Sequence, residues 1–213
     1  MPLPMVHLGV ARNIALSNSK LINDSLYYLG SIAPDAIHSR VGSNRLDKCR
    51  THIRNNDGTW YDDIIKFTSK HKNSEGKIEP FYIGYMIHIL TDLLWEDSIH
   101  SKVRMMMDRD NIEKNKQSSI YYNETDQLDF KLFKFYSWRN EVWCLLEKAY
   151  ALDVDELLTK EELDKWRVRT LHWYDLEVSK HSGPIKYLNF NILHDFINSA
   201  PTKIIGMITN IPT

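Results

Sequence analysis

The chain has 213 residues, 43% of them hydrophobic, which is enough to bury a core in one domain spanning residues 1–213. Lys and Arg total 27 against 28 for Asp and Glu, so the net charge of −1 gives no strong sign of nucleic-acid binding. No signal-peptide pattern, no run of roughly 18 apolar residues and no cysteine framework is found, so we expect a cytoplasmic protein without a transmembrane segment.

Apolar residues recur at steps of three and four along most of the chain, which is typical of helices, and strand patterns are sparse. Residues 30–58 instead have the composition of a long polar loop. We therefore expect an all-α, single-domain bundle of roughly six to eight helices. The predicted helices start near Pro4 and then cover 18–29, 59–71 with Thr59 as a cap, 80–108, 126–150, 159–179 with a capping box, and a last one from near Asn189 that Pro201 breaks or kinks.

Four polar residues at four-residue spacing mark the predicted helix over 80–108, namely His88, Asp92, Glu96 and His100. His88 and Asp92 project from one face a turn apart, so an imidazole nitrogen and a carboxylate oxygen can meet one cation. The alternative is a core pair whose members bond to each other or to backbone. His100 lies about 18 Å from His88 along the axis, too far to share an ion. Glu96 is a candidate for a second ion or for a hydrogen bond to a ligand.

Further candidate ligands lie upstream, with His7 in the first helix and Asp35, His38 and His52 in the polar segment. A set of imidazoles and carboxylates without thiolate suits zinc, manganese or iron in a hydrolytic role better than a structural zinc. Each of these histidines taken alone has an ordinary alternative as a capping or packing residue, and for His38 that alternative is favoured.

Four blocks of the sequence form a recognisable pattern: "PMVHLGVA" (4–11), "YYLGSIAPDAIHSR" (27–40), "KCRTHI" (48–53) and "GYMIHILTDLLW" (84–95). In this order they resemble the bacterial zinc-dependent phospholipase C family, which is related to the S1/P1 nucleases. The resemblance covers about the first 95 residues. It implies an all-α fold that holds a cluster of up to three zinc ions against a substrate phosphate.

The resemblance also implies roles for individual residues. Asp35, His52, His88 and Asp92 match the four ligands of the first zinc in the family. His7 matches a histidine that helps to hold another zinc, with Asp92 bridging the two ions. Asp35 also matches the aspartate to which the role of general base is assigned, so it is the expected catalytic residue.

The remaining zinc ligands of the family are missing. Ser98 stands where the family has a histidine six residues after the bridging aspartate. The later His-x-x-x-Glu pair is also absent, since the residues four places after His172, His181 and His194 are Leu176, Ile185 and Asn198. The resemblance therefore implies one complete and one partial site, with one or two zinc ions and a reduced ligand set. His38, Glu96 and His172 are candidates for an extra ligand.

The resulting hypothesis is a metal-dependent hydrolase of a small phosphate ester, a phosphodiesterase or phospholipase C-like enzyme that uses a metal-activated water. Lipid, nucleotide and other esters remain open as substrates. Basic residues between Arg40 and Arg54 are candidates to neutralise phosphate charge, beside the alternative of a solvated surface. The rival hypothesis is a non-catalytic metal-stabilised or ligand-binding helical protein that has lost part of the zinc centre. Residues 101–213 show no motif that carries chemistry.

Overall fold

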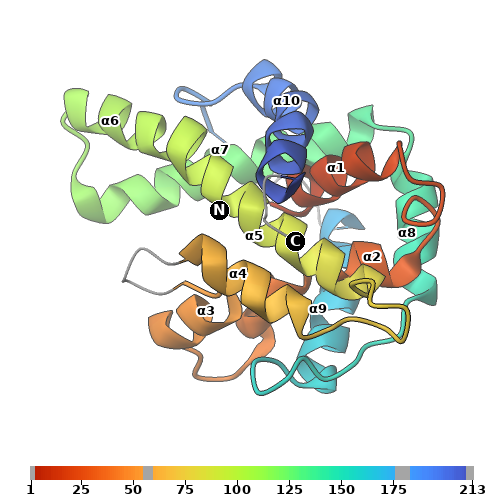
Figure 1. The fold of residues 1–213 in the computed structure, drawn as a ribbon. Helices are drawn as coiled ribbons and strands as arrows, with labels where there is room; N and C mark the ends of the chain where they lie inside the picture. Colours follow the sequence, from red (N-terminus) through yellow and green to blue (C-terminus); the bar gives the residue numbers. More distant parts are fainter. Residues whose placement is uncertain (1–2, 55–59, 176–182, 210–213) are drawn as a thin grey trace.

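The computed structural model describes residues 3–54, 60–175 and 183–209, and these form an all-α fold without a β-strand (Figure 1). The predicted fold class is confirmed. The described part holds ten α-helices, more than the expected six to eight. The elements are α1 (Pro4–Ala15), α2 (Ser25–Gly30), η1 (Ala33–Ser39), α3 (Arg45–Thr51), α4 (Trp60–Ser69), α5 (Pro80–Trp95), η2 (Glu96–His100), α6 (Ser101–Arg109), α7 (Lys114–Phe135), α8 (Arg139–Lys148), α9 (Lys160–His172), η3 (Trp173–Asp175) and α10 (Phe190–Thr209).

The polar segment 30–58 is partly helical where a loop is predicted. It contains the 3-10 helix η1 and the helix α3. Asn44 and Asp47 form a capping box that opens α3, because each side chain accepts a hydrogen bond from the backbone N–H of the other residue. The prediction gave weight to the polar composition of this segment and overlooked this local signal.

The predicted helix over 18–29 begins later than expected. The side chain of Asn18 accepts hydrogen bonds from the N–H groups of Lys20 and Leu21, which favours a turn. The carboxylate of Asp24 then accepts the N–H of Tyr27 at 2.9 Å and caps α2. Hydrogen bonds from side chains to nearby backbone therefore divide this segment into a turn and a short helix. The spacing of its apolar residues alone predicts one continuous helix.

The predicted helix over 126–150 is in fact two helices, because α7 ends at Phe135 and α8 begins at Arg139. The turn between them is held by Tyr136, whose hydroxyl lies 2.7 Å from Nδ1 of His194 on α10. Phe135, the last residue of α7, is 59% exposed beside this turn. Residues 114–125, outside the predicted helix, belong to α7. This helix forms a projecting arm with α6 (Figure 1).

Pro201 is predicted to break or kink the last helix; α10 continues through it, so the break does not occur. Proline removes the N–H that would bond the carbonyl four residues earlier, here that of Ile197. The side-chain amide of Asn13 on α1 donates to this carbonyl at 3.1 Å instead. A neighbouring helix thus supplies the missing donor, which periodicity within α10 cannot reveal.

The capping box of α9 is confirmed, with Thr159 accepting the N–H of Glu162. The helix ends at His172, followed by η3, whereas the prediction placed its end at 179, which is outside the described residues. The predicted cap Thr59 also lies outside them. Glu162 has a second role, because its carboxylate accepts hydrogen bonds at 2.6 and 3.0 Å from the guanidinium of Arg40, which follows η1. This bidentate pair joins η1 to α9.

Helix α5 lies at the centre of the fold and packs against α1, α2, α4, α10 and η1 (Figure 1). It is apolar almost all round, as expected of a helix surrounded by others. It continues through a single π-helical turn, η2, into α6, so the predicted helix over 80–108 is confirmed. Any polar residue in the first part of α5 is therefore buried.

The closest contact of α5 is with α2, where two glycines face the neighbouring backbone. A Cβ atom on Gly30 would lie 2.0 Å from the carbonyl oxygen of Phe81, and one on Gly84 would lie 2.0 Å from that of Tyr27. Both distances are far inside van der Waals contact, so only glycine permits this crossing. The contact lies one turn before His88.

We expect Gly84→Ala to lower the free energy of unfolding by about 3 kcal/mol, because the added methyl group forces two backbones apart. Chemical denaturation with fluorescence detection measures this difference. Gly206→Ala in α10 is the matched control, since a Cβ there meets no atom within 4 Å. The control is expected to be neutral or slightly stabilising. Equal stability of the two variants would contradict the close packing of α2 on α5.

A buried carboxylate ties the beginning of α1 to α7. Asp129 is fully buried and accepts the N–H of Met5 at 3.2 Å and the hydroxyl of Tyr174. Burial raises the pKa of Asp129 to about 8, although the hydrogen bond from Tyr174 works in the opposite direction. The folded protein therefore holds a proton on this group that the unfolded chain releases at lower pH.

Asp129→Asn is expected to become more stable relative to the parent chain as pH rises from about 4 to 8. Across this interval the carboxyl of Asp129 ionises in the unfolded chain and not in the folded one. The free energy of unfolding of the parent therefore falls by up to about 1.4 kcal/mol per pH unit, a loss that the amide variant does not have. Urea unfolding of both chains at several pH values, with chelator present, measures the difference. A stability difference that stays constant with pH would show that Asp129 is ionised when folded.

Candidate metal centre

Five buried polar side chains from four elements converge beside α5. His7 lies on α1, Asp35 on η1, His52 directly after α3, and His88 and Asp92 on α5. None of the five is more than 7% exposed. The structure thus brings together residues that are up to 85 positions apart, counting from His7 to Asp92.

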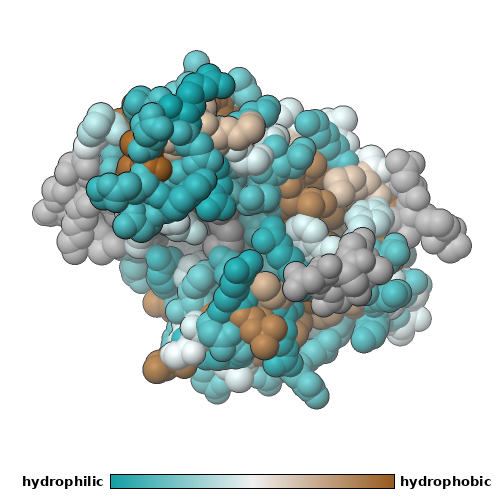
Figure 2. Space-filling view, turned by 90° about the vertical axis from the view of Figure 1, so that its left-hand side faces the viewer, coloured by the Kyte–Doolittle hydropathy of each residue, from teal (hydrophilic) through white to brown (hydrophobic). Residues whose placement is uncertain are grey.

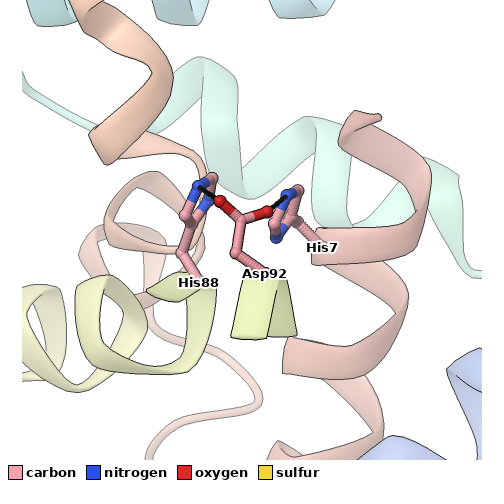
Figure 3. A group of neighbouring side chains, drawn as sticks. All are labelled: His7, His88 and Asp92. Carbon is pink, nitrogen blue, oxygen red and sulfur yellow. Dashed lines mark ion pairs between the residues drawn. The ribbon is translucent and has the colours of Figure 1, made fainter. Parts of the chain in front are cut away.

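Asp92 lies between the histidines. Its Oδ1 is 3.6 Å from Nε2 of His7, and its Oδ2 is 3.4 Å from Nε2 of His52 and 4.0 Å from Nε2 of His88. Figure 3 shows the two carboxylate oxygens directed toward different rings, one toward His7 and one toward His88. This is the arrangement a bridging carboxylate requires.

Asp35, on η1, completes the group. Its Oδ1 is 3.4 Å from Nε2 of His52, and its Oδ2 is 3.9 Å from Nε2 of His88. Two sets of three residues place one potential ligand atom each within 4.8 Å of the others, His7 with His88 and Asp92, and Asp35 with His52 and His88. Ligands of a tetrahedral zinc, with bonds of about 2.0 to 2.1 Å, lie about 3.3 Å apart, so these separations match a space for an ion.

Hydrogen bonds to backbone fix two of the imidazole rings. Nδ1 of His88 lies 2.9 Å from the carbonyl oxygen of Ser31, and Nδ1 of His52 lies 2.9 Å from that of Lys48. A carbonyl only accepts, so each Nδ1 carries the proton and each Nε2 presents a lone pair to the cluster. The ring of His7 instead stacks on His88, with centroids 3.8 Å apart.

Five atoms of the cluster, one from each residue, have no hydrogen-bond partner among the described residues. They are Nε2 of His7, His52 and His88, and Oδ1 of Asp35 and Asp92. An unpaired buried polar group costs about 1–3 kcal/mol, and five of them in one place need an explanation. A cation held between them supplies one. The residues present therefore fit a zinc ion.

The ionisation states also suit a metal. Burial lowers the pKa of His7 and of His88, so both rings are neutral near pH 7. Burial alone would raise the pKa of Asp35, but its interactions with the side chains of His52 and His88 outweigh this effect and hold it well below its usual value. Neutral imidazoles and ionised carboxylates are the forms that coordinate a metal.

A family model described as zinc dependent phospholipase C matches residues 6–183, most of the chain and all five residues of the cluster. The chain belongs to this family. No curated protein and no solved structure matches it. The family extends well beyond the first 95 residues, where the sequence resemblance is recognised. At the level of the family, the protein is a metal-dependent phosphoesterase. No described helix has the length and apolar character to cross a bilayer.

The other sequence candidates lie outside this group of five residues. His38 is near its edge, with Nε2 3.8 Å from Oδ1 of Asp35 and a side chain 43% exposed. Glu96 is directed to His100, whose Nδ1 lies 2.7 Å from its carboxylate. His172 pairs with Asp175 at 2.8 Å on the surface, and Ser98 lines a separate cavity against α10. None of these belongs to the sets of converging ligand atoms in the described part of the chain.

Two cavities reach the cluster. One of about 560 Å³ is lined by His52 and Asp92, together with Arg45, Lys48 and Arg54. The other, of about 400 Å³, is lined by Asp35 and His38 and by residues of α7, α9 and η3. Either volume admits a small phosphate ester.

The second cavity includes residues that the sequence analysis missed. Trp166 and Arg169 on α9 and Trp173 in η3 line it. Sequence analysis assigned no chemistry to this region because no family motif covers it. The spacing of three and four residues places these side chains close together on one helix face, and this was the available signal. Of the basic residues between Arg40 and Arg54, Arg40 is engaged with Glu162 and does not line either cavity.

The backbone around His52 is fixed by two side chains. The buried hydroxyl of Tyr85 donates to the carbonyl of Thr51, and Nε1 of Trp60 donates to the carbonyl of His52 at 3.0 Å. The first bond holds the end of α3 against α5, and the second holds it against α4. They therefore set where the imidazole of His52 lies.

Tyr85→Phe is expected to cost about 1–3 kcal/mol of stability, because it leaves the buried carbonyl of Thr51 without its donor. We also expect zinc to bind about 10-fold more weakly, since the position of His52 is less well defined. Urea unfolding of metal-free protein and a competitive zinc titration measure the two effects. The control is Tyr28→Phe, whose hydroxyl makes a longer bond of 3.3 Å to Ile22. If Tyr85→Phe matched this control in zinc affinity, the positioning role would be excluded.

Proposed function

We propose that His7, Asp35, His52, His88 and Asp92 hold one or two zinc ions, and that the protein hydrolyses a small phosphate ester. The observation that carries this proposal is the convergence of five buried, unpartnered ligand atoms in a member of the zinc dependent phospholipase C family. The complete set for one ion would be Asp35, His52, His88 and Asp92. His7 would hold a second ion together with Asp92, which would bridge.

The surroundings of His7 support the proposed reduced ligand set. Ser98, at the position of the missing family histidine, lines a cavity against α10 and does not face the cluster. Glu96 is directed to His100. No substitute ligand therefore stands beside His7 among the described residues, and manganese or iron remain alternatives to zinc at the complete site.

Zinc, when bound, lowers the pKa of a coordinated water toward neutrality and polarises a phosphoryl oxygen. Asp35 lies in the cavity of about 400 Å³ as an ionised carboxylate, so it orients the attacking water and accepts its proton. His38 lies 3.8 Å from Asp35, half exposed, and burial lowers its pKa, so it is neutral and able to pass the proton to solvent. His52 and His88 are held in orientation by their Nδ1 bonds.

The substrate class is a phosphate ester small enough for one of the two cavities. On the face shown in Figure 2, hydrophilic residues predominate and hydrophobic ones form small separate areas. That face gives no broad apolar surface on which a membrane would rest. A water-accessible ester is therefore the first substrate to test, with a phospholipid as the second.

The test compares Asp92→Asn with the control Asp97→Asn. Asp97 is a neighbouring exposed carboxylate, and the control makes the same chemical change there. The wild-type chain is expected to bind at least one zinc, measured by elemental analysis after chelation and reloading. At a zinc concentration of 100 times Kd, binding should add about 2.7 kcal/mol of stability. Asp92→Asn should lose at least about 100-fold in zinc affinity and all measurable turnover of an activated bis-aryl phosphodiester. Asp97→Asn should retain both.

Three outcomes would count against the proposal in different ways. If neither zinc nor manganese binds, the metal centre is wrong. If turnover occurs and survives Asp92→Asn, the site lies elsewhere. If zinc binds at the cluster but no phosphate ester is hydrolysed, the rival function, a non-catalytic metal-stabilised protein, is favoured.

A further inference from the structure

The cavity of about 400 Å³ beside Asp35 contains one cation in an unusual setting. The Cζ atom of Arg169 lies 4.5 Å from the ring centre of Trp166 and 4.4 Å from that of Trp173. The guanidinium is thus held between two aromatic faces, which orient it and restrict its rotation. All three residues line the same cavity as Asp35.

The donors of this guanidinium are unused by the rest of the described chain. Arg169 forms no hydrogen bond and no ion pair there, and its contacts are the two tryptophan rings. Its fork of N–H groups is therefore available to a ligand. Trp166 adds a second, independent sign, because it is only 7% exposed and its Nε1 has no hydrogen-bond partner. A rigid cation and a buried donor lining one cavity both call for an anionic acceptor.

A cationic ligand is excluded by the same contacts. Aromatic faces can bind a quaternary ammonium group, and this cavity holds two tryptophans. Both faces are already occupied by Arg169, which would repel a second cation. The carboxylates of Asp35 and Asp126 are also in the cavity, but the first is a ligand of the proposed zinc centre and is neutralised by it.

The cavity of about 560 Å³ is less suited to an anion. Its lining combines the basic residues Arg45, Lys48 and Arg54 with the acidic residues Glu96 and Asp97, in addition to Asp92. Opposite charges also meet in the cavity beside Asp35, where Asp126 lies with Arg169, so net charge does not distinguish the two cavities. No buried, unpartnered donor other than the cluster atoms lines it. Between the two entrances, the one with Arg169 is the better site for a phosphate.

We propose that Arg169 and Nε1 of Trp166 bind the phosphate oxygens of the substrate in the cavity beside Asp35, and that the substrate is an anionic phosphate ester without a quaternary ammonium group. This assignment rests on the proposed function, since it gives the reacting phosphate its place next to the metal centre. Arg169 then offsets charge on the phosphate.

The experiment measures binding of inorganic phosphate to zinc-loaded protein by calorimetry, with zinc content and thermal unfolding recorded for each variant. Arg169→Gln is expected to weaken phosphate binding by about 10- to 100-fold, because a charge-assisted, forked hydrogen bond is lost. Arg169→Lys keeps the charge without the fork, so a smaller loss is expected. The matched control is Arg54→Gln in the other cavity, where a guanidinium also lies over a tryptophan, 4.9 Å from the ring of Trp60. It should bind phosphate as the wild type does.

Several results would overturn the assignment without touching the proposed function. One is a zinc-loaded Arg169→Gln chain with wild-type phosphate affinity and wild-type KM for the phosphodiester. Another is loss of phosphate binding in Arg54→Gln instead. A third result needs no arginine variant. We expect excess tetramethylammonium to leave phosphate binding to the wild type unchanged, so competition between the two would count against the assignment. Binding of that cation, lost in Trp166→Leu, would identify the cavity as a cation site. Failure of the metal centre itself would show as absent zinc and absent turnover.

Discussion

The contact between the backbones of α2 and α5 is the constraint on which the centre depends. Gly30 and Gly84 allow the two helices to touch without intervening side chains. Ser31, the next residue after Gly30, is thereby close enough for its carbonyl to accept the proton of His88. The chain then leaves α2 along α5, and η1 follows within a few residues and delivers Asp35. A larger residue at either glycine would separate the carbonyl, the imidazole and the carboxylate together.

The second consequence of this packing is electrostatic. The crossing helices bury two carboxylates and three imidazoles in a core that offers these groups few other partners. Burying such groups is costly where their polar atoms lack hydrogen-bond partners, and one atom of each residue in the group has none. A cation supplies the missing interactions, so folding and metal binding are expected to be coupled in this chain. The site is thus a property of the core and not an addition to the surface.

The sequence could predict only some of this arrangement. The spacing of His88 and Asp92 placed both on one face of a long helix, and the resemblance supplied Asp35, His52 and His7. Helix periodicity could not show that Ser31 and Lys48 would orient two of the rings, because those bonds come from backbone atoms. The division of 126–150 and the continuity of α10 through Pro201 also depend on tertiary partners. Arg169 escaped attention since nothing local connects α9 to Asp35.

The ion pair of Arg40 and Glu162 sets how far along α9 Arg169 lies from the segment that carries Asp35. It clamps the chain after η1 to the first turn of α9, and Arg169 lies seven residues, about two turns, beyond Glu162. The helical residues between Glu162 and Arg169 therefore fix the distance and the direction of the guanidinium relative to this ion pair. Adding or removing one residue between Glu162 and Arg169 would rotate the guanidinium by about 100° about the helix axis, away from Asp35. The number of residues in this part of α9 is therefore under a geometric constraint, even where their identities are free to vary.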